Sequence, residues 1–210
     1  MDIIAIKTDG LSFAEVEGFL PCVSAGRRKA IFKKSVETDK VQSLIAGLLL
    51  RSEISRRIGI PENKLSFIKG VLGKPYVKGG GVQFSVSHTK GAVCVAIGND
   101  ADGEIGVDIE CRTRRASDKL KERVLSKGER DIVHTDEDFI RVWVKKEAFL
   151  KRTGIGVATD LKGADTSILP DTVEFSFGEY YIGASGKGAA EANITEISVN
   201  ELLSRFVRVN

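Results

Sequence analysis

The stretch that decides the fold of this chain is Ile105–Glu110, which reads I-G-V-D-I-E. Its apolar residues recur with a period of two, as in a β-strand that turns one face to a core. Because successive side chains of a strand point to opposite faces, Asp108 and Glu110 share a face with Gly106. Two neighbouring carboxylates repel each other unless something compensates them. The strand therefore has either a solvated acidic face or half of a site for a hard cation such as Mg²⁺.

A helix predicted over residues 138–152 brings a candidate third carboxylate. At about 100° per residue its apolar side chains form one arc, and both Glu147 and Lys151 fall within that arc. A carboxylate and an ammonium group on a core-facing side are costly unless they are paired or coordinated. They form either an ion pair along the helix or part of a polar site, in which Glu147 joins Asp108 and Glu110 around Mg²⁺.

Length and composition are those of an ordinary globular protein. The 210 residues suffice for one domain or two joined halves, with 42% hydrophobic and 29% charged residues. The net charge of +3 favours acidic partners but is too small for a nucleic-acid-binding surface. No apolar run approaches the ~20 residues that span a bilayer. We therefore expect neither nucleic acid nor membrane as a partner.

Cysteine usage and the first residues bear on the cellular compartment. The opening M-D-I-I-A-I-K lacks the basic and apolar regions of a signal peptide. Cys22, Cys94 and Cys111 are odd in number and widely spaced, which is typical of free thiols in a reducing compartment. These features predict a cytoplasmic protein.

The predicted elements follow one another in a mixed order. We expect strands at residues 2–8, 65–71, 82–87, 93–97, 105–110, 173–177, 180–184, 194–199 and 205–209. We expect helices after Ser24, from Thr38 or Asp39 to about Arg57, after the capping box Ser126–Glu129, and over residues 138–152. Because strands and helices do not alternate regularly, the predicted class is α+β.

Four motifs occur in one order along the chain. They are Gly73-Lys74-Pro75, Phe84–Thr89 (F-S-V-S-H-T), Gly106–Glu110 (G-V-D-I-E) and Trp143–Lys151 (W-V-K-K-E-A-F-L-K). Each alone is a weak signal, since a turn lysine, a single histidine or a helix ion pair is common on protein surfaces. Together, at these separations, they resemble the pattern of 4′-phosphopantetheinyl transferases of the longer, surfactin-synthetase-activating type. The motifs cover about residues 24–152.

The resemblance implies a fold and a reaction. The fold has two pseudo-symmetric α+β halves, each with an antiparallel sheet and packed helices. Residues 1–103 would contact the nucleotide of coenzyme A, and residues 104–210 would carry the Mg²⁺ site and the catalytic helix. A monomer is expected. The enzyme would move the 4′-phosphopantetheine arm of coenzyme A to a serine of an apo acyl or peptidyl carrier protein, releasing adenosine 3′,5′-bisphosphate. The carrier could serve fatty acid, polyketide or nonribosomal peptide synthesis.

The resemblance also implies roles for individual residues. As Mg²⁺ ligands it implies Asp108, Glu110 and Glu147. As catalytic residues it implies Lys151 at the pyrophosphate, and either Glu129 or a water held by Glu110 as acceptor of the serine proton. As contacts to coenzyme A it implies Arg28, Lys74, Pro75, Ser85, Ser87, His88 and Lys146.

The sequence departs from the family pattern at a few positions. Ser85 stands where asparagine is usual and Thr89 where serine is usual. Gln42 stands where the family often has an arginine. Either Arg28, with Arg27, Lys33 and Lys40 as alternatives, contacts the 3′-phosphate of coenzyme A instead, or coenzyme A binds more weakly. A competing interpretation is a non-catalytic module that binds coenzyme A or another phosphorylated ligand as a sensor.

Overall fold

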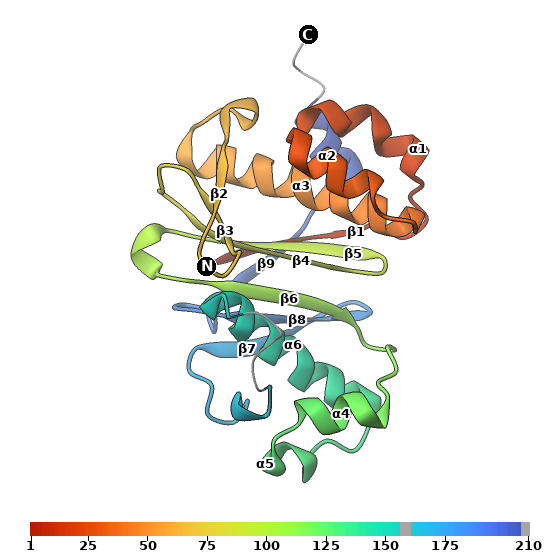
Figure 1. The fold of residues 1–210 in the computed structure, drawn as a ribbon, viewed down its shortest axis with the longest axis vertical. Helices are drawn as coiled ribbons and strands as arrows, with labels where there is room; N and C mark the ends of the chain where they lie inside the picture. The colour runs from red at the N-terminus through yellow and green to blue at the C-terminus, as the bar shows by residue number, and fades with distance from the viewer. Residues whose placement is uncertain (156–160, 207–210) are drawn as a thin grey trace.

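Two larger β-sheets pack face to face, and each is covered on its outer side by one long helix (Figure 1). The computed structural model describes residues 1–155 and 161–206. From one end of the molecule to the other, the layers are helix, sheet, sheet and helix. This arrangement confirms the predicted α+β class.

The first sheet has the strand order β4-β5-β1-β9. Its strands are β4 (Gln83–Thr89), β5 (Ala92–Gly98), β1 (Asp2–Lys7) and β9 (Asn193–Glu196). Neighbours are antiparallel except that β9 runs parallel to β1. The β4–β5 hairpin pairs Thr89 with Ala92, so its turn is shorter than predicted, and His88 belongs to the strand.

The second sheet is antiparallel and contains the strand that carries Asp108 and Glu110. Its order is β6 (Gly106–Cys111), β8 (Tyr180–Ser185) and β7 (Thr172–Phe177). Ile105, Val107 and Ile109 are buried between the two sheets. Small side chains of the first sheet, among them those of Cys94 and Ala96, face them, which allows the sheets to pack closely.

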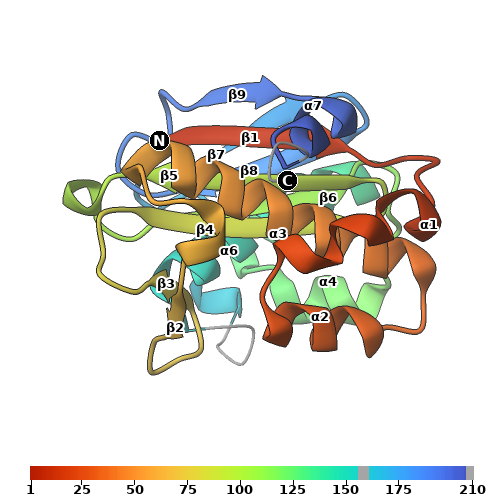
Figure 2. The same cartoon turned by 90° about the horizontal axis from the view of Figure 1, so that it is seen from above.

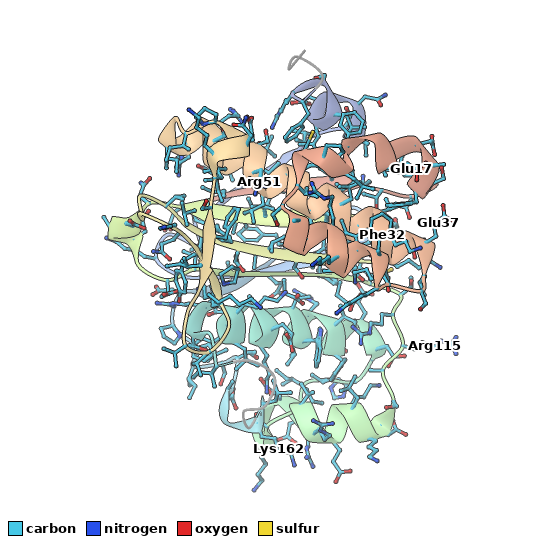
Figure 3. All side chains as sticks on the ribbon, turned by 45° about the horizontal axis from the view of Figure 1, so that its top comes forward. Glu17, Phe32, Glu37, Arg51, Arg115 and Lys162 are labelled. Atoms are coloured by element: carbon cyan, nitrogen blue, oxygen red, sulfur yellow. The ribbon has the colours of Figure 1, made fainter. Side chains whose placement is uncertain are left out.

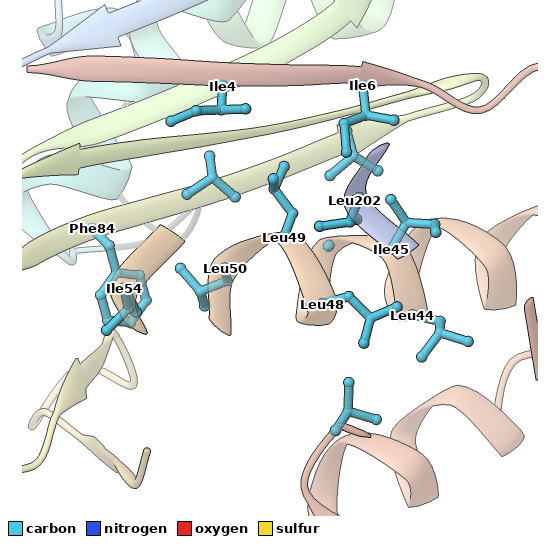
Figure 4. Close-up of a cluster of buried hydrophobic side chains, with 14 of the residues drawn as sticks. Ile4, Ile6, Leu44, Ile45, Leu48, Leu49, Leu50, Ile54, Phe84 and Leu202 are labelled. Carbon is cyan, nitrogen blue, oxygen red and sulfur yellow. The ribbon is translucent and has the colours of Figure 1, made fainter. Parts of the chain in front are cut away.

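The helix α3 (Glu37–Ile58) covers the first sheet (Figure 2). Figure 4 shows its apolar face, from Leu44 to Ile54, packed against Ile4, Ile6 and Phe84 of the sheet. The helix begins at Glu37, just before the predicted cap, and ends at Gly59, whose φ of 71° suits glycine.

The helix α6 (Asp136–Thr153) covers the second sheet and lies very close to it. A Cβ atom on Gly106 would lie 1.9 Å from the carbonyl oxygen of Ala148, and one on Gly183 would lie 2.1 Å from that of Val144. The two glycines thus let the helix backbone rest on β6 and β8. This contact sets the height of the α6 side chains above the acidic strand.

Shorter elements connect these layers. The helical ones are α1 (Phe13–Val16), η1 (Glu17–Cys22), α2 (Ala25–Phe32), η2 (Glu62–Lys64), η3 (Asp100–Asp102), α4 (Asp118–Val124), α5 (Lys127–Arg130), η4 (Leu161–Gly163) and α7 (Val199–Ser204). A small hairpin of β2 (Phe67–Lys69) and β3 (Pro75–Val77) stands beside the first sheet. Ser24 caps α2, and the capping box at Ser126 starts α5, as predicted.

The chain returns to the first sheet after β8. β9 extends that sheet beside β1, and Leu202 of α7 enters the core under α3. Of the strand predicted at 205–209, residues 205 and 206 form a turn after α7, and the rest lies outside the described residues. Among the described helices, none combines the length and apolarity that a membrane crossing requires.

Candidate active site

Three adjoining cavities border β4. The first is lined by Arg27, Gly47 and Arg51, the second by Lys74, Pro75 and Ser85, and the third by His88, Asp108 and Glu110. Val86 borders all three, and Glu147 and Lys151 border the second and third. The second and third cavities lie between the two halves of the molecule, and the first extends from them within the first half; together they are called the cleft.

Asp108 is the point where three elements meet. Its Oδ1 accepts hydrogen bonds from the Ser87 hydroxyl of β4 and from the Lys151 ammonium of α6, both at 2.7 Å. Lys151 also donates to the Ser87 hydroxyl at 2.7 Å. Lys151 thus pairs with the acidic strand rather than along its own helix with Glu147, and the polar-site interpretation of the helix is the one the geometry fits.

Glu147 is buried beside this group without a full set of partners. Its Oε1 is enclosed and has no hydrogen-bond partner among the described residues. Burial raises the pKa of Glu147, the charge of Asp108 raises it further, and Lys151 and Arg114 act in the opposite direction. A buried carboxylate oxygen without a donor is costly, and a bound cation would remove that cost.

Glu110 faces the same cavity, but both of its carboxylate oxygens already have protein partners. Its Oε1 accepts from the Thr89 hydroxyl at 2.5 Å and from the backbone N–H of Cys111 at 2.9 Å, and its Oε2 pairs with Arg114. Within the described ranges no three His, Cys, Asp or Glu side chains converge closely enough to hold a metal as they stand. Asp108 and Glu147 therefore fit a cation, whereas Glu110 fits one only if Arg114 moves.

Alternate residues of β4 carry hydroxyl groups that fasten the two halves together. Ser85 accepts a hydrogen bond from the backbone N–H of Val107 at 3.0 Å, Ser87 donates to Asp108, and Thr89 donates to Glu110. The period-two spacing of these hydroxyls was a usable signal in the sequence. It indicates that the residues expected to touch coenzyme A also hold the acidic strand in place.

His88 points to the other side of β4 and lines the third cavity. Its pKa is lowered by desolvation and then by the positive charges of Lys34, Lys151 and Arg27, with Asp39 acting in the opposite direction. Several cations therefore surround one wall of the cleft, an environment that suits phosphate groups.

Lys74 and Pro75 border the second cavity, but the Lys74 ammonium is already satisfied. It pairs with Glu104 and donates to the carbonyls of Ile105 and Arg152, both at 3.0 Å. Desolvation lowers the pKa of Lys74. The side chain therefore ties the β2–β3 hairpin to both halves and presents its hydrocarbon stem to the cleft.

Arg27, rather than Arg28, faces the cleft. Arg28 donates to the carbonyls of Leu20 and Val23 and so closes the turn before α2. Arg27 lines the first cavity, its guanidinium group has neither a hydrogen bond nor an ion pair within the described residues, and burial lowers its pKa. Gln42 lines a different cavity.

Glu129 and Lys146 do not line the cleft. They are 1% and 0% exposed and form an ion pair of 2.5 Å on the far side of α6. Lys146 also donates to the carbonyls of Val124 and Leu161, and Glu129 accepts from Ser126 and Thr166. Burial acts to raise the pKa of Glu129, but Lys146 and these donors together lower it.

Comparisons with known proteins match both halves of the chain. A model of the 4′-phosphopantetheinyl transferase superfamily matches residues 104–186, and one of the N-terminal region of 4′-phosphopantetheinyl transferases matches residues 12–100. The 4′-phosphopantetheinyl transferase Sfp of Bacillus subtilis is 30% identical over 169 residues, which cover 77% of this chain and 74% of that protein.

More distant relatives come from eukaryotes. The 4′-phosphopantetheinyl transferase pptA of Paxillus involutus is 26% identical over 205 residues, which cover 82% of this chain and 76% of that protein. The L-aminoadipate-semialdehyde dehydrogenase-phosphopantetheinyl transferase of Xenopus laevis is 24% identical over 172 residues, which cover 73% of this chain and 56% of that protein.

Proposed function

Because this chain belongs to the 4′-phosphopantetheinyl transferase family, we propose a division of labour among the residues of its cleft. The protein is a transferase, and it transfers the phosphopantetheine arm of coenzyme A to a carrier protein. No support has emerged for the alternative of a non-catalytic binding module. The roles below rest on the geometry of the cleft.

The observation that carries the proposal is the buried Oε1 of Glu147, which lacks a partner among the described residues and lies beside Asp108. We propose that Asp108 and Glu147 hold Mg²⁺, with Glu110 as the third ligand. Oxygen ligands of this kind suit that ion. When bound, Mg²⁺ would supply positive charge to the pyrophosphate oxygens.

Cationic and hydrogen-bonding side chains of the cleft would bind the phosphates. Lys151 and His88 line the cavity beside Asp108, and Arg27 lies farther along the cleft. Lys151 would donate hydrogen bonds where charge develops on the leaving phosphate. Arg27, whose guanidinium group has no hydrogen bond or ion pair among the described residues, is the residue we propose for the 3′-phosphate in place of Arg28.

The chemistry is a phosphoryl transfer. The carrier serine Oγ bonds to the β-phosphorus while the bond from that phosphorus to the bridging oxygen breaks, and adenosine 3′,5′-bisphosphate leaves. Of the two acceptors expected for the serine proton, Glu110 lines the cavity, and Glu129 is enclosed with Lys146. We therefore assign the proton to a water held by Glu110.

The arrangement of the cleft also supports proposals on the two halves of the chain and on its oligomeric state. We propose that residues 1–103 and 104–210 act as the two functional halves, with β9 and α7 crossing back to the first. Both sides of the cleft come from one chain, which supports a monomer. The free thiols of Cys22, Cys94 and Cys111 support a reducing compartment such as the cytoplasm. Carriers of fatty acid, polyketide and nonribosomal peptide synthesis are all proposed substrates.

The test is a transfer assay. The protein is mixed with coenzyme A, Mg²⁺ and an apo carrier of each class, and the mass of each carrier is measured. We expect at least one carrier to gain one phosphopantetheine group, and this gain to disappear with a chelator or in Asp108→Asn. Glu191→Gln, which changes an exposed carboxylate, is the matched control. No mass gain on any carrier would contradict the proposal.

A further inference from the structure

Arg114 reaches the acidic strand from the loop that follows it. Its guanidinium group pairs with Oε2 of Glu110 and lies over the ring of Trp143, 5.6 Å from the ring centroid. Arg114 lines the same cavity as Asp108 and Glu147. No motif of the sequence singled it out, and the mechanism above does not use it.

The three carboxylates of the cavity are compensated in three different ways. Lys151 pairs with Asp108, Arg114 pairs with Glu110, and Glu147 has an oxygen without a partner among the described residues. Arg114 therefore supplies the positive charge that compensates Glu110 in the cavity it shares with Asp108 and Glu147.

The two oxygens of Glu110 are not equivalent. Oε1 is held by the Thr89 hydroxyl at 2.5 Å and by the Cys111 N–H at 2.9 Å. Among the described residues, Oε2 is held by Arg114 alone. A cation that binds through Glu110 without breaking the strand's own hydrogen bonds must therefore take the oxygen that Arg114 occupies.

In the Glu110–Arg114 ion pair, the guanidinium group can readily be replaced by a divalent cation. The Glu110 side chain is 10% exposed, whereas that of Arg114 is 41% exposed. Glu110 therefore stays fixed in the strand, while the guanidinium can leave into solvent, where water solvates it. A guanidinium and a divalent cation are alternative partners for the same buried oxygen.

We propose that Arg114 is a displaceable positioning residue of the cation site. It holds Glu110 in place when no divalent cation is bound, and it gives up Oε2 of Glu110, together with its place over Trp143, when one binds. This inference rests on the proposed Mg²⁺ site. It adds a residue that sets the affinity of that site without being a ligand.

The test uses Trp143, the single tryptophan of the chain, as a reporter. The full-length protein with saturating coenzyme A and no carrier is titrated with Mg²⁺, and tryptophan emission and binding heat are recorded. We expect a saturable emission change in the wild type. In Arg114→Ala, the Mg²⁺ dissociation constant should fall about fivefold, the order expected for one half-exposed ion pair that need not be broken. The emission change should also shrink.

Arg115→Ala is the matched control, because it removes the same charge one residue away. Arg115 extends from the loop into solvent (Figure 3). Its emission change should match the wild type, and its dissociation constant should differ by less than twofold. Equal shifts in the two variants would overturn the inference and leave the cation site intact. Binding heat without any emission change would also overturn it. No Mg²⁺ binding by either readout, in wild type as in Asp108→Asn, would overturn the cation site itself.

Discussion

The two sides of α6 carry similar residues and use them differently. On one side Lys146 pairs with Glu129, and each partner has further hydrogen bonds to protein groups. Both side chains are shielded from solvent, and we call them the closed pair. On the other side Lys151 pairs with Asp108 in the wall of a cavity, beside a Glu147 oxygen that has no partner among the described residues. Lys146 and Glu147 are neighbours in the sequence.

The comparison shows what distinguishes a structural charge from a functional one. A buried charge whose hydrogen-bonding capacity is filled by protein groups has nothing left for a ligand, and its removal damages the fold. A buried charge that is only partly satisfied costs stability, and it keeps capacity for a substrate or an ion. The following experiments test this difference.

The largest expected effect is on the closed pair. Glu129→Ala leaves the Lys146 ammonium buried without its carboxylate, which typically costs about 3–5 kcal/mol. The free energy of unfolding, measured in urea at neutral pH, should fall by that order.

The double variant Glu129→Gln with Lys146→Met separates structure from chemistry. Replacing both charges of a buried pair is often nearly neutral. The double variant should recover much of the lost stability and keep transfer activity. If it folds stably but loses transfer by more than about a hundredfold, the size expected for a lost acid–base group, then Glu129 is the base after all.

The next largest effect is expected on catalysis, at the side of α6 that lines the cavity. Lys151→Ala should lower kcat of carrier modification by roughly 10²–10³-fold, equivalent to about 2.7–4 kcal/mol, because a donor to the leaving phosphate is lost. Stability should fall less than in Glu129→Ala, because Lys151 is 30% exposed and Asp108 keeps the Ser87 hydroxyl as a donor. Lys187→Ala removes an exposed ammonium and should leave kcat unchanged. Equal losses of kcat in both variants would refute a special role for Lys151.

A smaller effect is expected where α6 rests on β6. Gly106→Ala places a Cβ where the Ala148 carbonyl oxygen lies, and overpacking of this kind costs about 1–3 kcal/mol. The helix must move away from the strand, so Mg²⁺ affinity should fall together with stability. Gly18→Ala, which meets no atom within 4 Å, is the control. Unchanged Mg²⁺ affinity in a destabilised Gly106→Ala protein would separate the two effects and weaken the positioning argument.

The smallest expected effect is a difference in pH dependence between the two glutamates, measured with a chelator present. The pKa of Glu129 is lowered because its donors outweigh burial, so its stabilisation is present above the usual glutamate pKa of about 4.3 and lost as pH falls through the lowered value. The pKa of Glu147 is raised by burial, so its ionisation destabilises the fold as pH rises past the usual value. Glu147→Gln should therefore be more stable than wild type at pH 7, but not at pH 4. The same difference at both values would contradict this sign.

Much of the local structure could be predicted because it depends on neighbours in the sequence. The alternation of Ile105–Glu110 predicted β6, and the capping box at Ser126 predicted α5. The position of Glu147 within an apolar arc predicted that a carboxylate would be buried. Each of these patterns repeats over a few residues, and the structure confirms all three.

What could not be predicted depends on contacts between distant elements. Glu129 and Lys146 lie in separate helices, and only the packing of α5 against α6 brings them together. The family resemblance assigned both residues to the active site, and a match of motifs does not reveal which side of α6 the Lys146 side chain faces. Arg27 and Arg28 are adjacent on one short helix, and only the turn carbonyls of Leu20 and Val23 decide which of them faces the cleft. No sequence pattern in β9 or β1 indicates that these two strands pair in parallel.

That parallel pairing has a consequence for how the protein is made. β1 leaves the ribosome well before residues 193–196, the strand that covers its outer edge. Until those residues are made, the hydrogen-bonding groups along that edge have no native partner, and exposed edges of this kind favour association between chains. The nascent chain therefore depends on a strand that is made much later to protect β1.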